Sequence, residues 1–385
     1  MSVETISLGC RLNFAEAETI ARSAPAGEHW VVVNSCAVTN EAVRQTRQAI
    51  RRAHRRRPDA RILVTGCAAE LDPKGFEQMP EVARVAGNAG KLHAFDVKTP
   101  AVASGSHSVR SFVAIQDGCD HRCTFCSIWQ ARGRSISHSF ETIRDAVAQE
   151  IDRGAKEIVL TGVDITDYAG GLGGLCQKLL AAEPRLTRLR LSSLDSIEID
   201  GALMELIAGD KRLMPHFHLS LQAGDDMILK RMKRRHSRAQ SVAAVEAIKS
   251  ARPEATIGAD MIAGFPTETE QMALNSLKLL DDCDIVAAHV FPFSPRPDTP
   301  AQRMPQLGAE AVKARAARLR RRAEERRNAW LDSLVGTRQP LLVENGGKAH
   351  TDGFAPVAMP QARAGDIGIA RLLRREGAGL VGVFE

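Results

Sequence analysis

Short apolar runs alternate with amphipathic segments at the start of the chain. The runs VETISLGC, WVVVNSC and ARILVTGC each end on a cysteine, namely Cys10, Cys36 and Cys67. Helix-like segments lie between them, for example over residues 15–23 and 40–57. This alternation predicts a small parallel sheet, and ligands of such sheets usually bind at the carboxyl ends of the strands. We therefore expect the three cysteines to converge on one site.

The middle of the chain repeats a strand–helix pattern six times. Residues 99–109 (TPAVASGSHSV) are small and polar and predict a linker before this region. Helical patterns follow the strands, for example over residues 141–153, 239–251 and 268–281. A complete eight-unit barrel needs about 250 residues, so six units predict an incomplete (βα)6 barrel with its site at the carboxyl strand ends. The six expected strands are residues 111–116, 157–161, 188–192, 216–221, 256–262 and 285–291.

The pattern changes again near the C-terminus. A long basic helix is expected over residues 308–334, and short apolar runs then alternate with glycine-rich turns from Gly336 onward. These runs predict a small five-stranded barrel of the oligonucleotide-binding type. The fold class is therefore α/β with a C-terminal β-barrel, and the expected domains are residues 1–97, 98–334 and 335–385.

Composition adds limits to this organisation. The 385 residues are 44% hydrophobic, 25% charged and only 4% aromatic, and the net charge is +6. A basic balance favours a polyanionic partner without proving one. We see no signal peptide and no apolar run near the roughly 18 residues of a membrane span, so a cytoplasmic protein without a membrane partner is expected. Eight cysteines in a reducing compartment suggest ligands or core residues rather than disulfides.

A second group of cysteines follows the first barrel strand. Cys119, Cys123 and Cys126 have the spacing CxxxCxxC in DGCDHRCTFC. Three thiolates suit an iron–sulfur cluster and leave one iron open to a further ligand. The alternative is a zinc site with His121 or a distant residue as the fourth ligand. For the three N-terminal cysteines the alternative is burial as small core residues. Cys176 and Cys283 match no motif and are expected to be structural.

The cysteine motifs carry a family resemblance. CxxxCxxC after the first strand of a partial barrel resembles the radical S-adenosylmethionine (SAM) superfamily, and GCRLNFAEAE, NSCAVTNEA and VTGCAAE resemble the N-terminal domain of its methylthiotransferases. The resemblance implies two 4Fe–4S clusters, each held by one cysteine trio, so that all six cysteines are catalytic and metal-binding. It also implies that SAM binds the open iron of the barrel cluster. Its cleavage yields a radical that removes hydrogen from the substrate, and the N-terminal cluster carries the sulfur that is transferred.

The same resemblance places further SAM contacts at the ends of the barrel strands. The segments LTGVDITDY, RLSSLD, HFHLSLQAGDDMILKRMKRRH and GADMIAGFPTETE resemble the family's second to fifth strand ends. KAHTDGFAPV resembles the RNA-binding TRAM module. The implied partners are a tRNA anticodon stem-loop and an electron donor of the flavodoxin or ferredoxin type, and a monomer is expected. The residues assigned to cofactor binding are Thr161, Gly162, Asp164, Ser192, Ser193, Gln222, Arg231, Asp260 and Gly264.

Two arginine-rich stretches bear on the RNA partner. Arg44, Arg47, Arg51 and Arg55 recur at helical spacing after Cys36 and are expected to contact tRNA phosphates. For the second stretch, RNA contact and a solvated helix face are equally open. It contains Arg315, Arg318, Arg320, Arg321, Arg322, Arg326 and Arg327.

The sequence around Cys36 and Cys67 most resembles that of the branch that converts threonylcarbamoyladenosine at position 37 of tRNA to its 2-methylthio derivative. The alternatives are methylthiotransfer to isopentenyladenosine or to a ribosomal-protein aspartate and, in another class, a zinc-containing RNA-binding protein. Three positions depart from the family pattern. SIWQARGRSIS after Cys126 lacks the usual proline, and Thr267 and Asp298 stand where glycine is usual.

Overall fold

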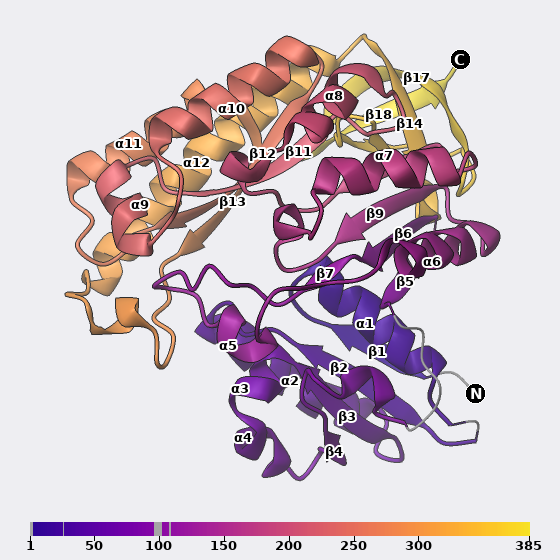
Figure 1. Cartoon of the computed structure of the whole chain (residues 1–385), viewed down its shortest axis with the longest axis vertical. Coiled ribbons are helices and arrows are strands. Elements are labelled where there is room, and N and C mark those ends of the chain that lie inside the picture. The colour runs from indigo at the N-terminus through magenta and orange to yellow at the C-terminus, as the bar shows by residue number, and fades with distance from the viewer. Residues whose placement is uncertain (1–2, 26, 96–101, 108) are drawn as a thin grey trace.

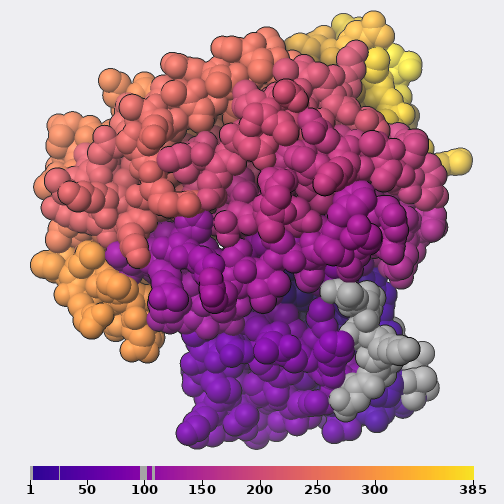
Figure 2. Space-filling view, viewed as in Figure 1, coloured from indigo at the N-terminus to yellow at the C-terminus, as the bar shows by residue number. Residues whose placement is uncertain are grey.

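The computed structural model describes residues 3–25, 27–95, 102–107 and 109–385. An N-terminal α/β unit lies below a central barrel of strands and helices, and a small β-barrel lies at the upper right (Figure 1). The space-filling view shows the N-terminal unit packed against the lower face of the barrel (Figure 2). The predicted boundary between residues 97 and 98 falls outside the described residues.

The N-terminal sheet has four parallel strands in the order β1-β2-β3-β4, which confirms the predicted sheet. Strand β2 is buried on both faces, because Val31 and Val33 pack toward Ile50 while Val32 packs toward Ile20. Its continuous apolar run reflects this two-sided burial. The strands are Glu4–Ser7 (β1), Trp30–Ser35 (β2), Arg61–Gly66 (β3) and Arg84–Val85 (β4), and the helices are Arg11–Arg22 (α1), Asn40–Arg56 (α2), Cys67–Leu71 (α3) and Pro73–Glu77 (α4).

Six parallel strands form the central partial barrel, as predicted. Parallel bridges from Leu189 to Leu213 and from Leu194 to Leu219 join its two sheets. Capping fixes several helix starts; Ser237, for example, forms a capping box with Gln240. The strands are Arg110–Ala114 (β6), Glu157–Thr161 (β9), Leu189–Leu191 (β10), His216–Gln222 (β11), Thr256–Ala263 (β12) and Ile285–Pro292 (β13). The helices are Phe140–Asp152 (α6), Leu172–Ala182 (α7), Gly201–Gly209 (α8), Asp226–Met232 (α9), Arg238–Ala251 (α10), Glu270–Asp282 (α11) and Ala309–Leu334 (α12).

The predicted linker is wrong for its described part. Residues Ser104–His107 form strand β5, which pairs antiparallel with β6, whereas residues 99–101 and 108 lie outside the described residues. Helix α1 explains the small residues, because a Cβ on Gly105 would lie 2.7 Å from Cβ of Glu18. Thr19 also donates a hydrogen bond to the Ser104 carbonyl at 2.8 Å. Small side chains here permit close helix–strand packing.

Helix α12 uses its arginines within the protein. Arg315 pairs with Glu268 at 2.9 Å, and Arg322 and Arg326 pair with Asp281 on α11 at 2.7 and 2.8 Å. The second basic stretch therefore docks α12 onto the barrel to a large extent. None of the helices in the described ranges is long and apolar enough to cross a membrane.

The C-terminal strands close into a barrel in the order β14-β15-β16-β18-β17, which confirms the predicted five-stranded barrel. Its core contains Leu341, Val343, Leu372 and Leu380, and Leu331 of α12 packs against them. The strands are Arg338–Val343 (β14), Lys348–Thr351 (β15), Pro356–Ala358 (β16), Ile367–Glu376 (β17) and Gly379–Phe384 (β18).

A loop of this small barrel reaches the amino-terminal end of the central barrel. Phe354 stacks on His216, at the start of β11, with ring centroids 5.2 Å apart. The guanidinium groups of Arg110 and Arg190 lie 5.0 and 4.7 Å from its ring centroid. Glu157, at the start of β9, pairs with both arginines at 3.1 and 2.9 Å. This end of the barrel is thus filled by the C-terminal module.

Candidate active site

Three strand ends of the N-terminal sheet carry the first cysteine trio. Cys10 precedes α1, Cys36 follows β2, and Cys67 is the first residue of α3. Because the strands are parallel, all three lie at the same edge of the sheet. Gly9 has φ +95°, and a Cβ there would lie 2.7 Å from the Cys36 sulfur, so this position requires glycine. The expected convergence of these strand ends is present.

The second trio lies in the loop between β7 (Gln116–Asp117) and α5 (Ile128–Arg132). Thr124 anchors the loop, since its amide donates to the Met232 carbonyl and its hydroxyl to the Arg231 carbonyl. The Arg234 guanidinium lies 3.8 Å from the Cys123 sulfur. Burial raises the pKa of Cys119 and of Cys126 to about 12. These groups are protonated thiols at neutral pH until a cation replaces the proton.

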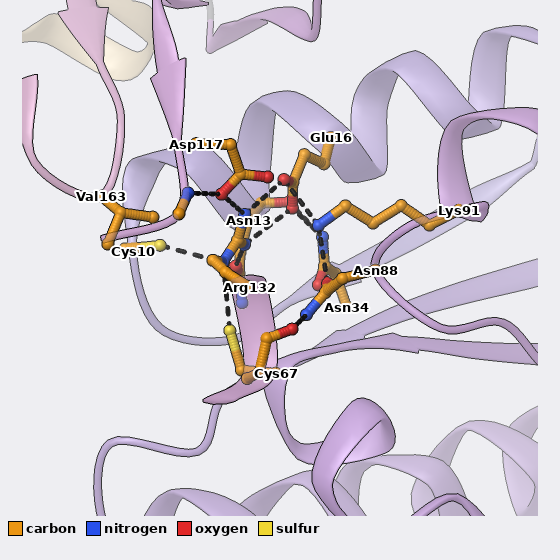
Figure 3. Close-up of polar contacts among 12 residues, drawn as sticks. Cys10, Asn13, Glu16, Asn34, Cys67, Asn88, Lys91, Asp117, Arg132 and Val163 are labelled. Carbon is orange, nitrogen blue, oxygen red and sulfur yellow. Dashed lines mark hydrogen bonds and ion pairs between the residues drawn. The ribbon is translucent and has the colours of Figure 1, made fainter. Parts of the chain in front are cut away.

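The two trios face each other across the contact between the N-terminal unit and the barrel. Burial raises the pKa of Cys36 to about 11 and, as noted, that of Cys126, with the nearby Cys67 adding to both shifts. Arg132, which follows the second trio on α5, donates from Nε to the Cys67 sulfur at 3.2 Å (Figure 3). Asn40 of α2 contacts Ser294 beyond β13, with its amide 3.2 Å from the hydroxyl oxygen.

The end of β9 meets the loop of the second trio. Gln116 holds the segment after β9, because its side-chain oxygen accepts hydrogen bonds from the backbone amides of Val163 and Asp164 at 3.1 and 2.9 Å. A Cβ on Gly162 would lie 2.7 Å from the Gln116 carbonyl oxygen. Asp164 places its carboxylate 2.5 Å from His121 Nε2 and 4.0 Å from the Cys119 sulfur. Thr161, the last residue of β9, is buried.

The end of β10 reaches the second trio through an arginine. Ser192 and Ser193 follow this strand, and Asp195 pairs with Arg234 at 2.8 Å. Burial opposes the charge of Asp195, but the neighbouring His236 and the charge of Arg234 lower its pKa to about 2. Asp195 is thus an anion that orients Arg234 toward Cys123.

Gln222, Asp260 and Arg231 lie around the other half of the barrel mouth. Gln222 ends β11 with φ +66°, which is strained backbone for this residue type. The Asp260 carboxylate accepts from His218 and His289 at 3.0 and 3.1 Å. Burial opposes the charge of Asp260, yet these two hydrogen bonds lower its pKa. Arg231 points its Nη1 to the Thr267 carbonyl at 3.3 Å.

Gly264, which follows β12, packs against helix α12. It has φ +74°, and a Cβ there would lie 2.9–3.0 Å from atoms of Val312 on α12. Its amide donates to the Glu268 carboxylate at 3.1 Å. Helix packing is therefore sufficient to account for glycine at this position.

A cavity of about 140 Å³, with aromatic side chains and the polar Gln222 and Asp260 in its lining, lies where the N-terminal unit meets the barrel mouth. Phe125, from the second cysteine loop, lines it together with Phe291 and Phe293 from the end of β13. Val38 and Thr39, which follow Cys36, close it from the N-terminal unit. Segments that carry both trios therefore meet at one cavity suited to a flat apolar ring.

Comparison with known proteins agrees with this arrangement. The radical SAM superfamily matches residues 113–280, and the uncharacterized protein family UPF0004 matches residues 2–87. The threonylcarbamoyladenosine tRNA methylthiotransferase MtaB of Rickettsia prowazekii is 41% identical over 99% of this chain and 95% of its own length. The chain belongs to the radical SAM methylthiotransferase family.

Other relatives of this methylthiotransferase include both tRNA-modifying branches. The Thermotoga maritima protein, also named threonylcarbamoyladenosine tRNA methylthiotransferase MtaB, is 31% identical over 89% of this chain and 86% of its length. The tRNA-2-methylthio-N(6)-dimethylallyladenosine synthase of Erythrobacter litoralis is 30% identical over 96% and 93%. The radical SAM methyltransferase TsrM of Kitasatospora setae shares the fold with a TM-score of 0.52 at 14% identity, over 73% of this chain and 66% of that one.

The radical SAM family implies a 4Fe–4S cluster and SAM, and the barrel trio fits them. Its three sulfurs come from one loop at the carboxyl end of β6, and the side-chain Nε of Arg234 beside it is buried without a hydrogen-bond partner among the described residues. Buried cationic and thiol groups of this kind suit an anionic metal–sulfur group. Cys176 and Cys283 lie in the hydrophobic core of the methylthiotransferase barrel, as expected.

Several residues of this methylthiotransferase site were missed from the sequence. They are Arg132, Arg234, Phe125, Phe291, Phe293 and His289. Arg132 and Gly133 form an Arg-Gly pair in SIWQARGRSIS, directly after the barrel cysteines, and this position was a usable signal. The three phenylalanines lacked one, because a scattered phenylalanine is more often an ordinary core residue.

Proposed function

We propose that this enzyme adds a methylthio group to threonylcarbamoyladenosine at position 37 of tRNA. The observation that carries the proposal is one cavity lined by segments that carry the two cysteine trios, in a chain similar over almost its whole length to proteins named for this reaction. The first four relatives found all bear the threonylcarbamoyladenosine name. This favours that branch over the dimethylallyladenosine branch.

Two 4Fe–4S clusters are part of the proposal, one at Cys119, Cys123 and Cys126 and one at the N-terminal trio. When bound at the barrel trio, the cluster and SAM supply a one-electron cleavage that produces a hydrogen-abstracting carbon radical. Arg234 compensates negative charge at Cys123. Gln116 fixes the loop after β9, so that Asp164 lies beside the same trio. Its carboxylate can accept a hydrogen bond from the amino group of SAM.

The cavity holds the target base in this proposal. The rings of Phe125, Phe291 and Phe293 are half-buried and offer apolar and edge contacts to an adenine, and a base bound against them would displace water from a reactive carbon. Val38 and Thr39 keep the base next to Cys36, where the sulfur is delivered. Such a base is drawn out of the anticodon loop, as enzymes that modify nucleobases require.

Phosphate contacts are expected on the N-terminal unit and the C-terminal barrel. Arg44 and Arg47 on α2 already pair with Glu41 and Asp72 at 2.6 and 2.8 Å. Both pairs are exposed and therefore weak, so RNA phosphates can compete for these arginines. A steep salt dependence of tRNA binding is the expected consequence.

The decisive experiment compares Cys36→Ala with Cys123→Ala in the purified enzyme. We expect Cys123→Ala to abolish both SAM cleavage and product, since the radical source is lost. Cys36→Ala is expected to retain SAM cleavage and to lose methylthio transfer by at least about 10³-fold, the order of a lost essential group. Product formation by Cys36→Ala would disprove the role of the N-terminal trio. Cys176→Ala is the matched control and should retain both reactions.

Nucleoside mass spectrometry separates the possible substrates. Cells without this gene should lose 2-methylthio-threonylcarbamoyladenosine and retain its precursor. Loss of the dimethylallyladenosine product instead would assign the other tRNA branch, and an unchanged profile would direct attention to a ribosomal protein. Protein that holds zinc and no iron would support an RNA-binding protein instead.

A further inference from the structure

Arg132 is enclosed between the two cysteine trios. Its side chain is 1% exposed, although it belongs to the short helix α5 directly after the barrel trio. Its partners come from α1, from the start of α3 and from the strand that precedes the barrel trio (Figure 3). No other arginine in the described part of the chain is hydrogen-bonded to Cys10, Cys36 or Cys67.

All five N–H groups of this guanidinium have acceptors. Nη1 lies 2.8 Å from both Glu16 Oε1 and Asp117 Oδ1, whereas Nη2 lies 2.7 Å from Asn13 Oδ1 and 3.1 Å from Glu16 Oε2. The fifth donor, Nε, points at the Cys67 sulfur at 3.2 Å. A guanidinium has five donors and no acceptor, so the sulfur completes a fully satisfied set. Lysine has three donors from one nitrogen and cannot replace it.

The carboxylates that hold Arg132 are themselves fixed. Glu16 is buried and pairs with Lys91 at 2.6 Å. Burial favours the neutral acid, but Arg132 and Lys91 lower the pKa of Glu16 to about 2, so it remains an anion. Arginine keeps its proton at any ordinary pH, and the Arg132 guanidinium is held 2.8 Å from both Glu16 and Asp117. The guanidinium is therefore a permanent cation at the sulfur.

Asn13 extends the same network to the other two cysteines. It is 1% exposed, and its Nδ2 donates to the carbonyls of Leu8 and Ser35 at 2.8 and 3.0 Å. Its Oδ1 accepts from the Cys10 sulfur at 3.5 Å and from Arg132. The Asn13 side-chain amide thus contacts the segments of Cys10 and Cys36. The Arg132 guanidinium contacts Cys67 and Asp117, which precedes the barrel trio.

We infer that Arg132 is a positioning residue that sets the orientation and the electron affinity of the sulfur at Cys67. The inference rests on the proposed role of the N-terminal trio as a cluster site. A hydrogen bond to a ligating sulfur, and a fixed positive charge beside it, favour the reduced cluster. Because α5 directly follows the barrel trio, the same residue also sets where that trio stands relative to Cys67.

The test isolates the N-terminal trio. In full-length protein with Cys119, Cys123 and Cys126 replaced by alanine, iron is measured after anaerobic reconstitution, and the midpoint potential is measured by EPR-monitored titration. Arg132→Lys in this background is expected to lower the potential by about 59 mV or more, which is a tenfold change for a one-electron couple. Arg134→Lys is the control, because the Arg134 side chain is 85% exposed two residues away and should leave the potential unchanged.

The outcomes are distinguishable. Absence of iron from the parent protein would refute the two-cluster function and remove the basis of this inference. Iron-loaded Arg132→Lys with an unchanged potential would overturn the inference alone. If Arg132→Lys fails to fold or to load iron, the parent protein labelled with [¹⁵N]arginine decides. Its reduced cluster should show a ¹⁵N hyperfine coupling, and a spectrum without that coupling would overturn the inference.

Discussion

The two ends of the central barrel are both lined by buried polar groups, but only the amino-terminal end ties its charged groups into a dense set of ion pairs. At the amino-terminal end, Glu157 pairs with Arg110, Arg188 and Arg190 at 2.9–3.2 Å. Asp352 from the C-terminal barrel pairs with Arg188 at 2.5 Å. Charges of both signs surround Phe354 and pair with one another within the chain.

The carboxyl-terminal end differs in having several buried polar atoms without hydrogen-bond partners. Ser127 Oγ, Ser196 Oγ and Arg234 Nε are buried there without hydrogen-bond partners among the described residues. The non-glycine residues Arg122, Gln222, Thr267 and Asp298 have positive φ in its loops, and at the amino-terminal end Asp284 and Phe354 do as well. Buried polar atoms without partners in the chain mark sites that bind ligands. The comparison separates an end built for stability from an end built for chemistry.

The largest expected effect concerns the charge of Glu157 at the amino-terminal end of the barrel. Burial favours neutral Glu157, but Arg190 above all, with Arg110 and Arg188, lowers its pKa to about 2. A depressed carboxyl pKa stabilises the fold fully above the unfolded value near 4.3, and this is lost as pH falls toward 2. We expect Glu157→Gln to lower the free energy of unfolding by about 3 kcal/mol at pH 7. The difference from the wild type should shrink below about pH 4.5.

Urea denaturation at pH 7, 4 and 3 measures this difference. Glu310→Gln is the control, because Glu310 is exposed at the start of α12. A gap between wild type and Glu157→Gln that stays constant with pH would show that Glu157 acts through packing and not through its charge.

The next effect tests whether the C-terminal module stabilises the central barrel. Phe354→Ala removes the ring between His216 and the arginines and should cost about 2 kcal/mol of unfolding free energy, since the ring is half-buried. Phe354→Leu retains most of the volume and should cost less than about 1.5 kcal/mol. Both variants should retain SAM cleavage, because the cysteine loop lies at the other end. Denaturant titration with a SAM-cleavage assay checks both statements.

The same contrast explains what the sequence could reveal. The strand–helix alternation and the five-strand ending were readable, because buried strands give apolar runs whatever they pack against. Strand β5 was misread as a linker because Gly105 and its small neighbours are dictated by α1, a partner remote in sequence. The ion pairs at the amino-terminal end of the barrel could not be predicted for the same reason. Their members Arg110, Glu157 and Asp352 come from three separate segments. The cysteine motifs could be recognised from the sequence, because each depends on residues close together in the chain.

The smallest effect concerns backbone strain at the functional end. Thr267 and Asp298 have φ +66° and +60°, and both stand where the family usually has glycine. A β-branched residue is costly in this region, whereas aspartate tolerates it better. Thr267→Gly should therefore stabilise the protein by about 0.5–1 kcal/mol after the added chain entropy of glycine is subtracted. Asp298→Gly should change stability by less.

Thr269→Gly provides the matched control for this change. Thr269 has φ −84° and caps α11. Its replacement by glycine should therefore lower the free energy of unfolding by roughly a few tenths of a kcal/mol. Thermal unfolding of the three variants gives the order directly. Equal effects at positions 267 and 269 would mean that the loop relaxes away from positive φ in solution. Stabilisation by Thr267→Gly with slower methylthio transfer would instead mean that the strained loop, whose carbonyl at 267 accepts from Arg231, serves the reaction.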